Sequence, residues 1–237
     1  FDATGVDITA STPAPPGWDG TVKALHWSLA LAVLVEVPAG YVMSSTYGPS
    51  FKDGHVLDLH ILASQVHHTL GFLMLAAALA WVLRRRLRPR PGFDPAMPDW
   101  QRALARLVQG LLVLLLLLVP LSGWAALSAL ADSPQFGPTH LWFFGTDRLL
   151  PRIWPARPFD DPLGYALFGR MHVWALWAGL GLLVLHLGSA LWHHFVVRDG
   201  VLRRMWPLAA AGGSAAAGRP SPRRGAPARS PDDPGLR

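Results

Sequence analysis

The feature that most constrains this chain is the grouping of its apolar residues into four long blocks. They cover about residues 22–45, 60–83, 104–131 and 166–196, and the third contains the run LLVLLLLLVPLSGW. A bilayer core is crossed by about 20 apolar helical residues, so each block is long enough to span it. The alternative is a soluble bundle of buried helices, but such helices should carry a polar face. The blocks therefore predict an all-α fold, an integral membrane four-helix bundle.

The charged residues lie between the blocks and predict how the chain crosses the membrane. Residues 84–106 carry seven Arg and two Asp, and residues 198–237 carry eight Arg and three Asp. Residues 46–58 hold one Lys and two Asp, and residues 132–170 hold four Arg and four Asp. Loops rich in Lys and Arg stay in the cytoplasm, so we expect loop 84–106 and both termini there, and loops 46–58 and 132–170 on the other side. Residues 1–21, with three Asp and no base, disagree weakly with this orientation.

The composition also excludes several classes of protein. The net charge of +6 comes from Arg residues at the ends of membrane spans, so we expect no nucleic-acid partner. The chain has no cysteine, which excludes disulfides, thiolate iron–sulfur ligation and haem attached through C-x-x-C-H. Any metal or redox centre must then be held by His, Met or carboxylates. We expect no cleaved signal peptide, because the first block is too long for an h-region.

Three segments accompany or interrupt the four-span domain, which we place at residues 22–207. Residues 1–21 form a polar, Pro-rich N-terminal arm, and residues 208–237 are of low complexity and are expected to be disordered. The loop 132–165 contains LWFFGTDRLLPRIWPARPFDD. It is either an interfacial cap, since Trp favours headgroup depth, or a docking surface for a periplasmic or membrane redox partner.

Seven of the ten histidines lie in the blocks or at their ends: His26, His67, His68, His172, His186, His193 and His194. An ionisable side chain inside a membrane is costly and is a functional hypothesis by default. A lone one is more often a hydrogen-bonding residue between helices. We expect the remaining histidines, His55, His60 and His140, to be solvated in or beside loops.

Four of these histidines form two pairs at matching depths. His172 and His186 are fourteen residues apart, so they lie on one helix face, roughly 21 Å apart along the axis. His172 is then near the outer edge of the hydrocarbon layer and His186 near the cytoplasmic edge. His26 opens the first span at the depth of His186, and His67 lies early in the second span at the depth of His172.

Histidine pairs that join two helices at one depth indicate haem. Facing neutral imidazoles can supply both axial ligands to haem iron, whereas zinc requires about four ligands that converge on one point. We therefore predict two haem b groups held between helices, one by His26 and His186 and the other by His67 and His172. Nearby glycines would let either a macrocycle or another helix approach closely: Gly71, Gly179, Gly181 and Gly188.

Four motifs resemble those of the bacterial cytochrome b561 family of di-haem membrane proteins. They are LHW at 25–27, HHTLG at 67–71, PLSGW at 120–124 and HHFVVRDGVLRRMWP at 193–207. The resemblance runs from about residue 22 to residue 207, and it implies a place in the bacterial inner membrane. It also implies the iron ligands His26, His67, His172 and His186, the same residues that the depth argument selects.

The chain departs from the family pattern in polar residues that are not iron ligands. Gln109 stands where members often have His, and Val173 stands where many have Glu. These changes bear on quinone or proton handling. Glu36, in the middle of the first span, has no evident family counterpart; it is either a proton carrier or a protonated residue bonded to a neighbouring helix.

The resemblance implies electron transfer between a donor outside the cytoplasm and the quinone pool, with ubiquinone or another quinone as substrate. The chain would be the haem subunit of a redox complex or, alternatively, a stand-alone superoxide:ubiquinone oxidoreductase. A haem-free membrane anchor or small transporter is the alternative from another class. Iron with two imidazole ligands has no open position, so chemistry must occur at the haem edge.

We expect the quinone to react near the cytoplasmic haem, and electrons to enter at the outer one. His193 and His194 lie roughly 10–12 Å beyond His186, at headgroup depth, and are not expected to bind iron. They either contact a quinone or a haem propionate or are simply solvated. The candidate contacts are Gln109, His193, His194 and Arg170.

Overall fold

The computed structural model describes residues 18–87, 97–130 and 152–206. Within these ranges lie four long helices: α1 (Gly20–Ser50), α2 (Gly54–Leu87), α3 (Asp99–Leu130) and α4 (Tyr165–Trp192). A π-helical turn, η1 (His193–Val197), continues α4, and the short helix α5 (Val201–Met205) follows. All four long helices are long and apolar enough to cross a membrane. The prediction of an all-α, four-helix membrane protein is confirmed.

The helices extend beyond the apolar blocks that predicted them. α1 continues to Ser50 and α2 begins at Gly54, so most of the segment 46–58, which we expected to be a loop, is helical. Asp53 caps the start of α2, because its carboxylate accepts the backbone N–H of His55 at 2.8 Å. Apolar composition marks only the part of a helix that lies in lipid, whereas backbone hydrogen bonds continue the helix past that boundary. Residues 1–17, 131–151 and 207–237 lie outside the described residues.

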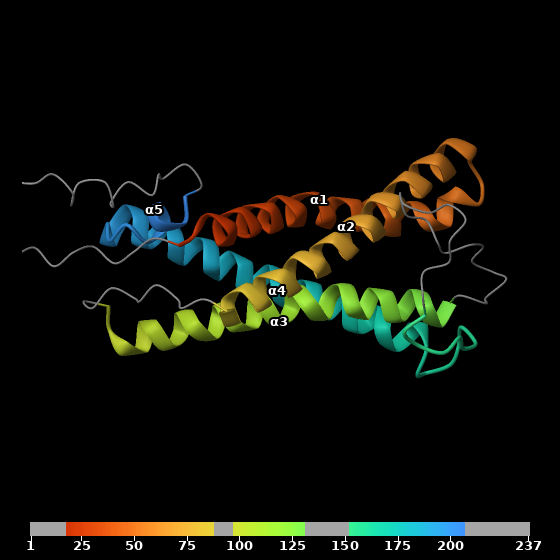
Figure 1. The fold of residues 1–237 in the computed structure, drawn as a ribbon. Helices are drawn as coiled ribbons and strands as arrows, with labels where there is room; N and C mark the ends of the chain where they lie inside the picture. The colour runs from red at the N-terminus through yellow and green to blue at the C-terminus, as the bar shows by residue number, and fades with distance from the viewer. Residues whose placement is uncertain (1–17, 88–96, 131–151, 207–237) are drawn as a thin grey trace, which may run out of the picture.

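The helices run alternately up and down and associate as two pairs (Figure 1). α1 packs along α2 and α3 packs along α4, and α2 also contacts α3. α4 does not pack closely against α1 or α2. We call the end where α1 begins and α4 ends the terminal end, and the opposite end, where α2 begins, the loop end.

Two contacts close the terminal end. Asp19 accepts the backbone N–H of Val22 at 3.0 Å and so caps α1, and its other oxygen lies 3.0 Å from the guanidinium of Arg84 on α2. The indole Nε1 of Trp27 donates to the carbonyl of Met205 at 2.9 Å. The LHW motif therefore anchors the last described helix, α5, against the start of α1.

Most buried positions of the bundle carry Ala, Ser or Thr, and many large apolar side chains face outward. Ala78 and Ala129 are 1% and 2% exposed, whereas Leu34 and Trp174 are 71% and 73% exposed. Small residues allow helices to approach closely inside lipid, where large apolar side chains gain nothing by avoiding the solvent. Small side chains between the helices and large apolar ones on the outside are typical of a membrane-embedded bundle.

Candidate functional site

The structure brings the four predicted histidines together in two pairs. The ring centroids of His26 on α1 and His186 on α4 are 6.3 Å apart, and those of His67 on α2 and His172 on α4 are 5.9 Å apart. The first pair lies nearer the terminal end and the second nearer the loop end. We call them the terminal-end pair and the loop-end pair. This is the pairing that the depth argument predicted.

The spacing within each pair fits one metal ion between two imidazoles. Two imidazoles bound to one ion through bonds of about 2 Å have ring centroids roughly 6 Å apart. No group of three or more His, Asp or Glu side chains that could hold a metal ion exists among residues 18–87, 97–130 and 152–206. Each pair also joins two helices that are not closely packed against each other, α1 with α4 and α2 with α4. The donor set and its surroundings therefore fit haem iron with two axial imidazoles.

His172 is oriented by the PLSGW motif of α3. Its Nδ1 lies 2.8 Å from the carbonyl oxygen of Val119 and must donate to it, because a carbonyl only accepts. A Cβ added to Gly123 would lie 3.1 Å from this same nitrogen. The missing side chain at Gly123 thus lets the ring reach Val119, and the contact leaves Nε2 of His172 as the nitrogen with a free lone pair.

His67 lies against α1, beside a carboxyl group. Its Nδ1 lies 3.0 Å from Oε1 of Glu36, and both side chains are 15% exposed. A Cβ added to Gly40 would come within 2.9 Å of the ring atom Cε1 of His67. Glu36 on α1 therefore contacts the neighbouring helix α2, as in one of the two interpretations of the sequence. The residue that it contacts, His67, is a candidate iron ligand.

The glycines that contact these rings differ from the ones that the sequence singled out. Gly40 and Gly123 lie against histidine rings, whereas a Cβ on Gly71 would lie 3.3 Å from Oε1 of Glu36. A Cβ on Gly179 would make an ordinary contact with Leu115, and one on Gly181 or Gly188 would meet nothing within 4 Å. In the sequence, each of these two glycines closely follows a proline within a span. Gly40 comes two residues after Pro38, and Gly123 ends the P-L-S-G part of the motif that begins at Pro120.

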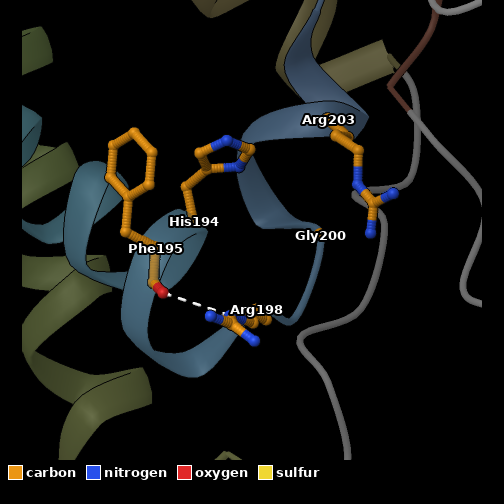
Figure 2. Close-up of a pocket in the computed structure, with 5 residues that line it drawn as sticks. All are labelled: His194, Phe195, Arg198, Gly200 and Arg203. Atoms are coloured by element: carbon orange, nitrogen blue, oxygen red, sulfur yellow. Dashed lines mark hydrogen bonds between the residues drawn. The ribbon is translucent and has the colours of Figure 1, made fainter.

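Of the two histidines predicted to contact quinone or a propionate at the terminal end, one is bonded within the protein and the other lines a hollow. Nδ1 of His193 lies 2.5 Å from the carboxylate of Asp199, and both side chains are largely buried. His194 instead lines a hollow of about 290 Å³ together with Phe195, Arg198, Gly200 and Arg203 (Figure 2). Arg198 and Gly200 have φ angles of 59° and 76°, and these two left-handed residues turn the chain from η1 into α5.

No hydrogen bond or ion pair among the described residues links the other two predicted contact residues, Gln109 and Arg170, to either histidine pair. Gln109 is half-buried on α3. Arg170 is exposed, and its Nε donates to the carbonyl of Ala166 on its own helix at 2.9 Å.

His60, which we expected to be solvated, is part-buried, and its Nδ1 lies 3.0 Å from the carbonyl of Met43, so it joins α2 to α1. That expectation was wrong because the helices continue through the predicted loop.

Part of the aromatic loop 132–165 is folded against the loop end of the bundle. The backbone N–H of Arg157 donates to the carbonyl of Ala129 at 3.1 Å, and that of Ile153 donates to the hydroxyl of Ser128 at 3.2 Å. Trp154 packs edge to face on Phe168 of α4, with ring centroids 4.9 Å apart. Residues 152–164 therefore cover this end, and the rest of the loop lies outside the described residues.

Comparison with known proteins decides the family. The model of the family described as prokaryotic cytochrome b561 matches residues 17–208. The chain belongs to the prokaryotic cytochrome b561 family. It is similar to cytochrome b561 homolog 2 of Escherichia coli (strain K12), with 29% identity over 197 residues, which are 82% of this chain and 93% of the relative. It is also similar to cytochrome b561 homolog 1 of the same organism, with 26% identity over 191 residues, or 77% and 93% of the two chains.

Membership confirms the resemblance drawn from the motifs. Proteins of the cytochrome b561 family bind b-type haem in the membrane and transfer electrons, and this chain has the four membrane helices for that role. A haem-free anchor or transporter is thereby excluded.

Proposed function

We propose that this cytochrome b561 holds two haem b groups and passes electrons between them across the membrane. His67 and His172 would bind the iron at the loop end, and His26 and His186 the iron at the terminal end. The observation that carries the proposal is the presence of two facing imidazole pairs with centroid distances of 5.9 and 6.3 Å. A haem b held by two imidazoles takes up and releases single electrons.

The protein surroundings favour haem binding at both positions. At the loop end, the hydrogen bond from Nδ1 of His172 to the carbonyl of Val119 orients that ring, and a carboxyl oxygen of Glu36 lies 3.0 Å from Nδ1 of His67. A hydrogen bond of this kind fixes the tautomer and raises the basicity of the other ring nitrogen. At the terminal end, Nδ1 of His26 is buried and has no hydrogen-bond partner among the described residues, and Trp81 lies beside it with ring centroids 6.0 Å apart.

We place the quinone at the terminal end, beside the hollow lined by His194, Arg198 and Arg203 (Figure 2). Imidazole and guanidinium groups can donate hydrogen bonds to quinone carbonyls, and an imidazole can relay a proton. The Arg-rich segments at this end favour the cytoplasmic side of the bacterial inner membrane, with both termini inside. Electrons would then enter from a donor outside, at the loop end.

The donor distinguishes two versions of this function. Residues 152–164 present aromatic and charged side chains at the loop end, where Trp154 and Phe159 are at least partly exposed. Such a surface favours a protein donor, and this chain would then be the haem subunit of a larger redox complex. The alternative is a stand-alone superoxide:ubiquinone oxidoreductase, in which a small anionic donor reaches the same end.

The test combines haem stoichiometry with quinone reduction. A pyridine haemochrome assay on the purified protein should give two non-covalent haems per chain, and one or none would refute the arrangement. The reduced protein should then be reoxidised by a soluble ubiquinone analogue under anaerobic conditions. If the reduced haem bands persist after quinone is added, the assignment of quinone as the substrate is wrong.

A further inference from the structure

Glu36 is unusual in both its identity and its position. It is the only glutamate in the sequence; the other 14 of the 15 acidic residues are aspartates. It lies in the middle of α1, where an ionisable group is costly in a membrane, and its side chain is 15% exposed. A cost of this kind requires a compensating interaction, and the contact that the structure shows is with Nδ1 of His67, 3.0 Å away.

The surroundings hold this carboxyl against the imidazole. A Cβ at Gly71, one turn after His67, would lie 3.3 Å from Oε1 of Glu36, so α2 leaves room for the carboxyl beside His67. Gly40, one turn after Glu36 on α1, leaves room for the ring. The two glycines are complementary, because each one on its own helix makes space for the polar side chain of the other helix.

The consequence for a metal ligand does not depend on the protonation of Glu36. A carboxyl oxygen carries negative partial charge in either state, and this one lies 3.0 Å from Nδ1 of His67. A negative group beside Nδ1 raises the basicity of Nε2, the nitrogen that would bind iron. A more basic ligand stabilises the oxidised, more positively charged metal ion and therefore lowers its reduction potential.

The other candidate ligands have different neighbours. Nδ1 of His172 contacts a neutral backbone carbonyl, that of Val119, and no carboxyl group among residues 18–87, 97–130 and 152–206 lies within ion-pair distance of His26. His67 thus has a carboxyl contact. Its partner in the loop-end pair, His172, has no such contact, and neither does His26 at the terminal end. This difference lowers the potential at the loop end relative to the terminal end.

We infer that Glu36 is a positioning residue for His67, which lowers the reduction potential of the loop-end haem and so directs electrons from the loop end towards the terminal end. The inference rests on the proposed function, since it requires two haems held by the two histidine pairs. It assigns to Glu36 neither contact with substrate nor proton transport.

The test is a redox titration of the haem absorbance in the full-length protein, with the electron paramagnetic resonance signals of the ferric haems as a second readout. Glu36→Leu removes the carboxyl group beside His67, and Glu36→Gln keeps one oxygen. We expect the potential of the loop-end haem to rise in Glu36→Leu and to rise less in Glu36→Gln, with the terminal-end haem unchanged. The loop-end signal is identified by its retention in His186→Ala. Leu34→Ala, at an exposed position on the same helix, is the matched control.

The outcomes separate this inference from the function on which it rests. If wild type contains two haems and Glu36→Leu leaves both potentials and both resonance signals unchanged, the role of Glu36 is wrong and the two-haem proposal stands. Equal shifts of both haems would likewise overturn it, because they indicate a general effect of a buried charge. If wild type lacks two haems, the proposed function itself fails. If Glu36→Leu does not retain haem, Glu36→Gln and Glu36→Asp, which shortens the reach to His67, provide the same comparison.

Discussion

His172 donates from Nδ1 to the backbone carbonyl of Val119 across 2.8 Å, and this bond joins α4 to α3 beside a proline inside the helix. Backbone atoms move less than side chains, so the carbonyl fixes both the tautomer and the direction of the ring. The approach is possible only because Gly123 has no side chain, since its Cβ would lie 3.1 Å from the same nitrogen.

Adding a methyl group at the glycines that face the rings should disturb the loop-end haem alone. A Cβ at Gly40 would lie 2.9 Å from His67, which forces the ring or the helix to move, and such overpacking typically costs about 1–3 kcal/mol. Gly40→Ala and Gly123→Ala should lower the haem content from about two to about one per chain. Gly181→Ala, where a Cβ meets nothing within 4 Å, is the control and should retain both haems.

Removing one ligand from each pair should remove one haem. His186→Ala should lose the terminal-end haem and keep the loop-end one, and His67→Ala should do the reverse, because the pairs share no residue. The measurement is the pyridine haemochrome content, together with the low-temperature spectrum of the reduced protein. Loss of both haems, or of neither, from a single replacement would show that the pairing is wrong.

His193 and His194 should be dispensable for haem binding. Asp199 holds His193 at 2.5 Å and also accepts the backbone N–H of Val201 at 3.0 Å, so it stabilises the turn between η1 and α5. Asp199→Ala leaves buried polar groups without a partner, which costs about 1–3 kcal/mol. We expect a lower temperature of thermal unfolding with both haems retained. The assignment is contradicted if the variant with alanine at both histidines loses a haem spectrum.

Quinone reduction should depend on the terminal end. His194→Ala and Arg203→Gln alter the lining of the hollow and should slow reoxidation of the reduced protein by a ubiquinone analogue, leaving the haem content intact. Gln109→Ala and His193→Ala test the remaining contacts of this end that the sequence suggested. Wild-type rates in all four variants, combined with slower reoxidation after changes in loop 132–165, would move the quinone site to the loop end.

The turn before α4 should loosen in acid. The backbone N–H of Leu163 and the guanidinium of Arg157 both bond to the carboxylate of Asp161 and lower its pKa below the ordinary value of 3.8. A lowered pKa means that the stabilisation is present above the unfolded value and is lost as the pH falls through the folded one. The protection of backbone amides in residues 152–164 against hydrogen exchange, relative to the unfolded chain at the same pH, should therefore fall below about pH 4. Asp161→Asn should show this lower protection already at neutral pH, and Asp160→Asn is the matched control.

The sequence by itself determined the class of protein and the residues of the two pairs. Four apolar blocks fix four membrane helices because crossing length and composition are local properties. The depth of each histidine follows from its place along its own block, which is why His26 could be matched with His186 and His67 with His172 without any tertiary contact. The helix ends were less accurate, since the loop expected at 46–58 is mostly helical.

Only the tertiary structure decided what each imidazole contacts besides its facing partner. Depth leaves free the rotation of each helix about its own axis, and a change of about 100° replaces one residue by the next on a given face. Packing of α1 on α2 places Glu36 and Gly40 at His67, and packing of α3 on α4 places Val119 and Gly123 at His172. These rotations are set by the whole helix interface, so no single stretch of sequence contains them.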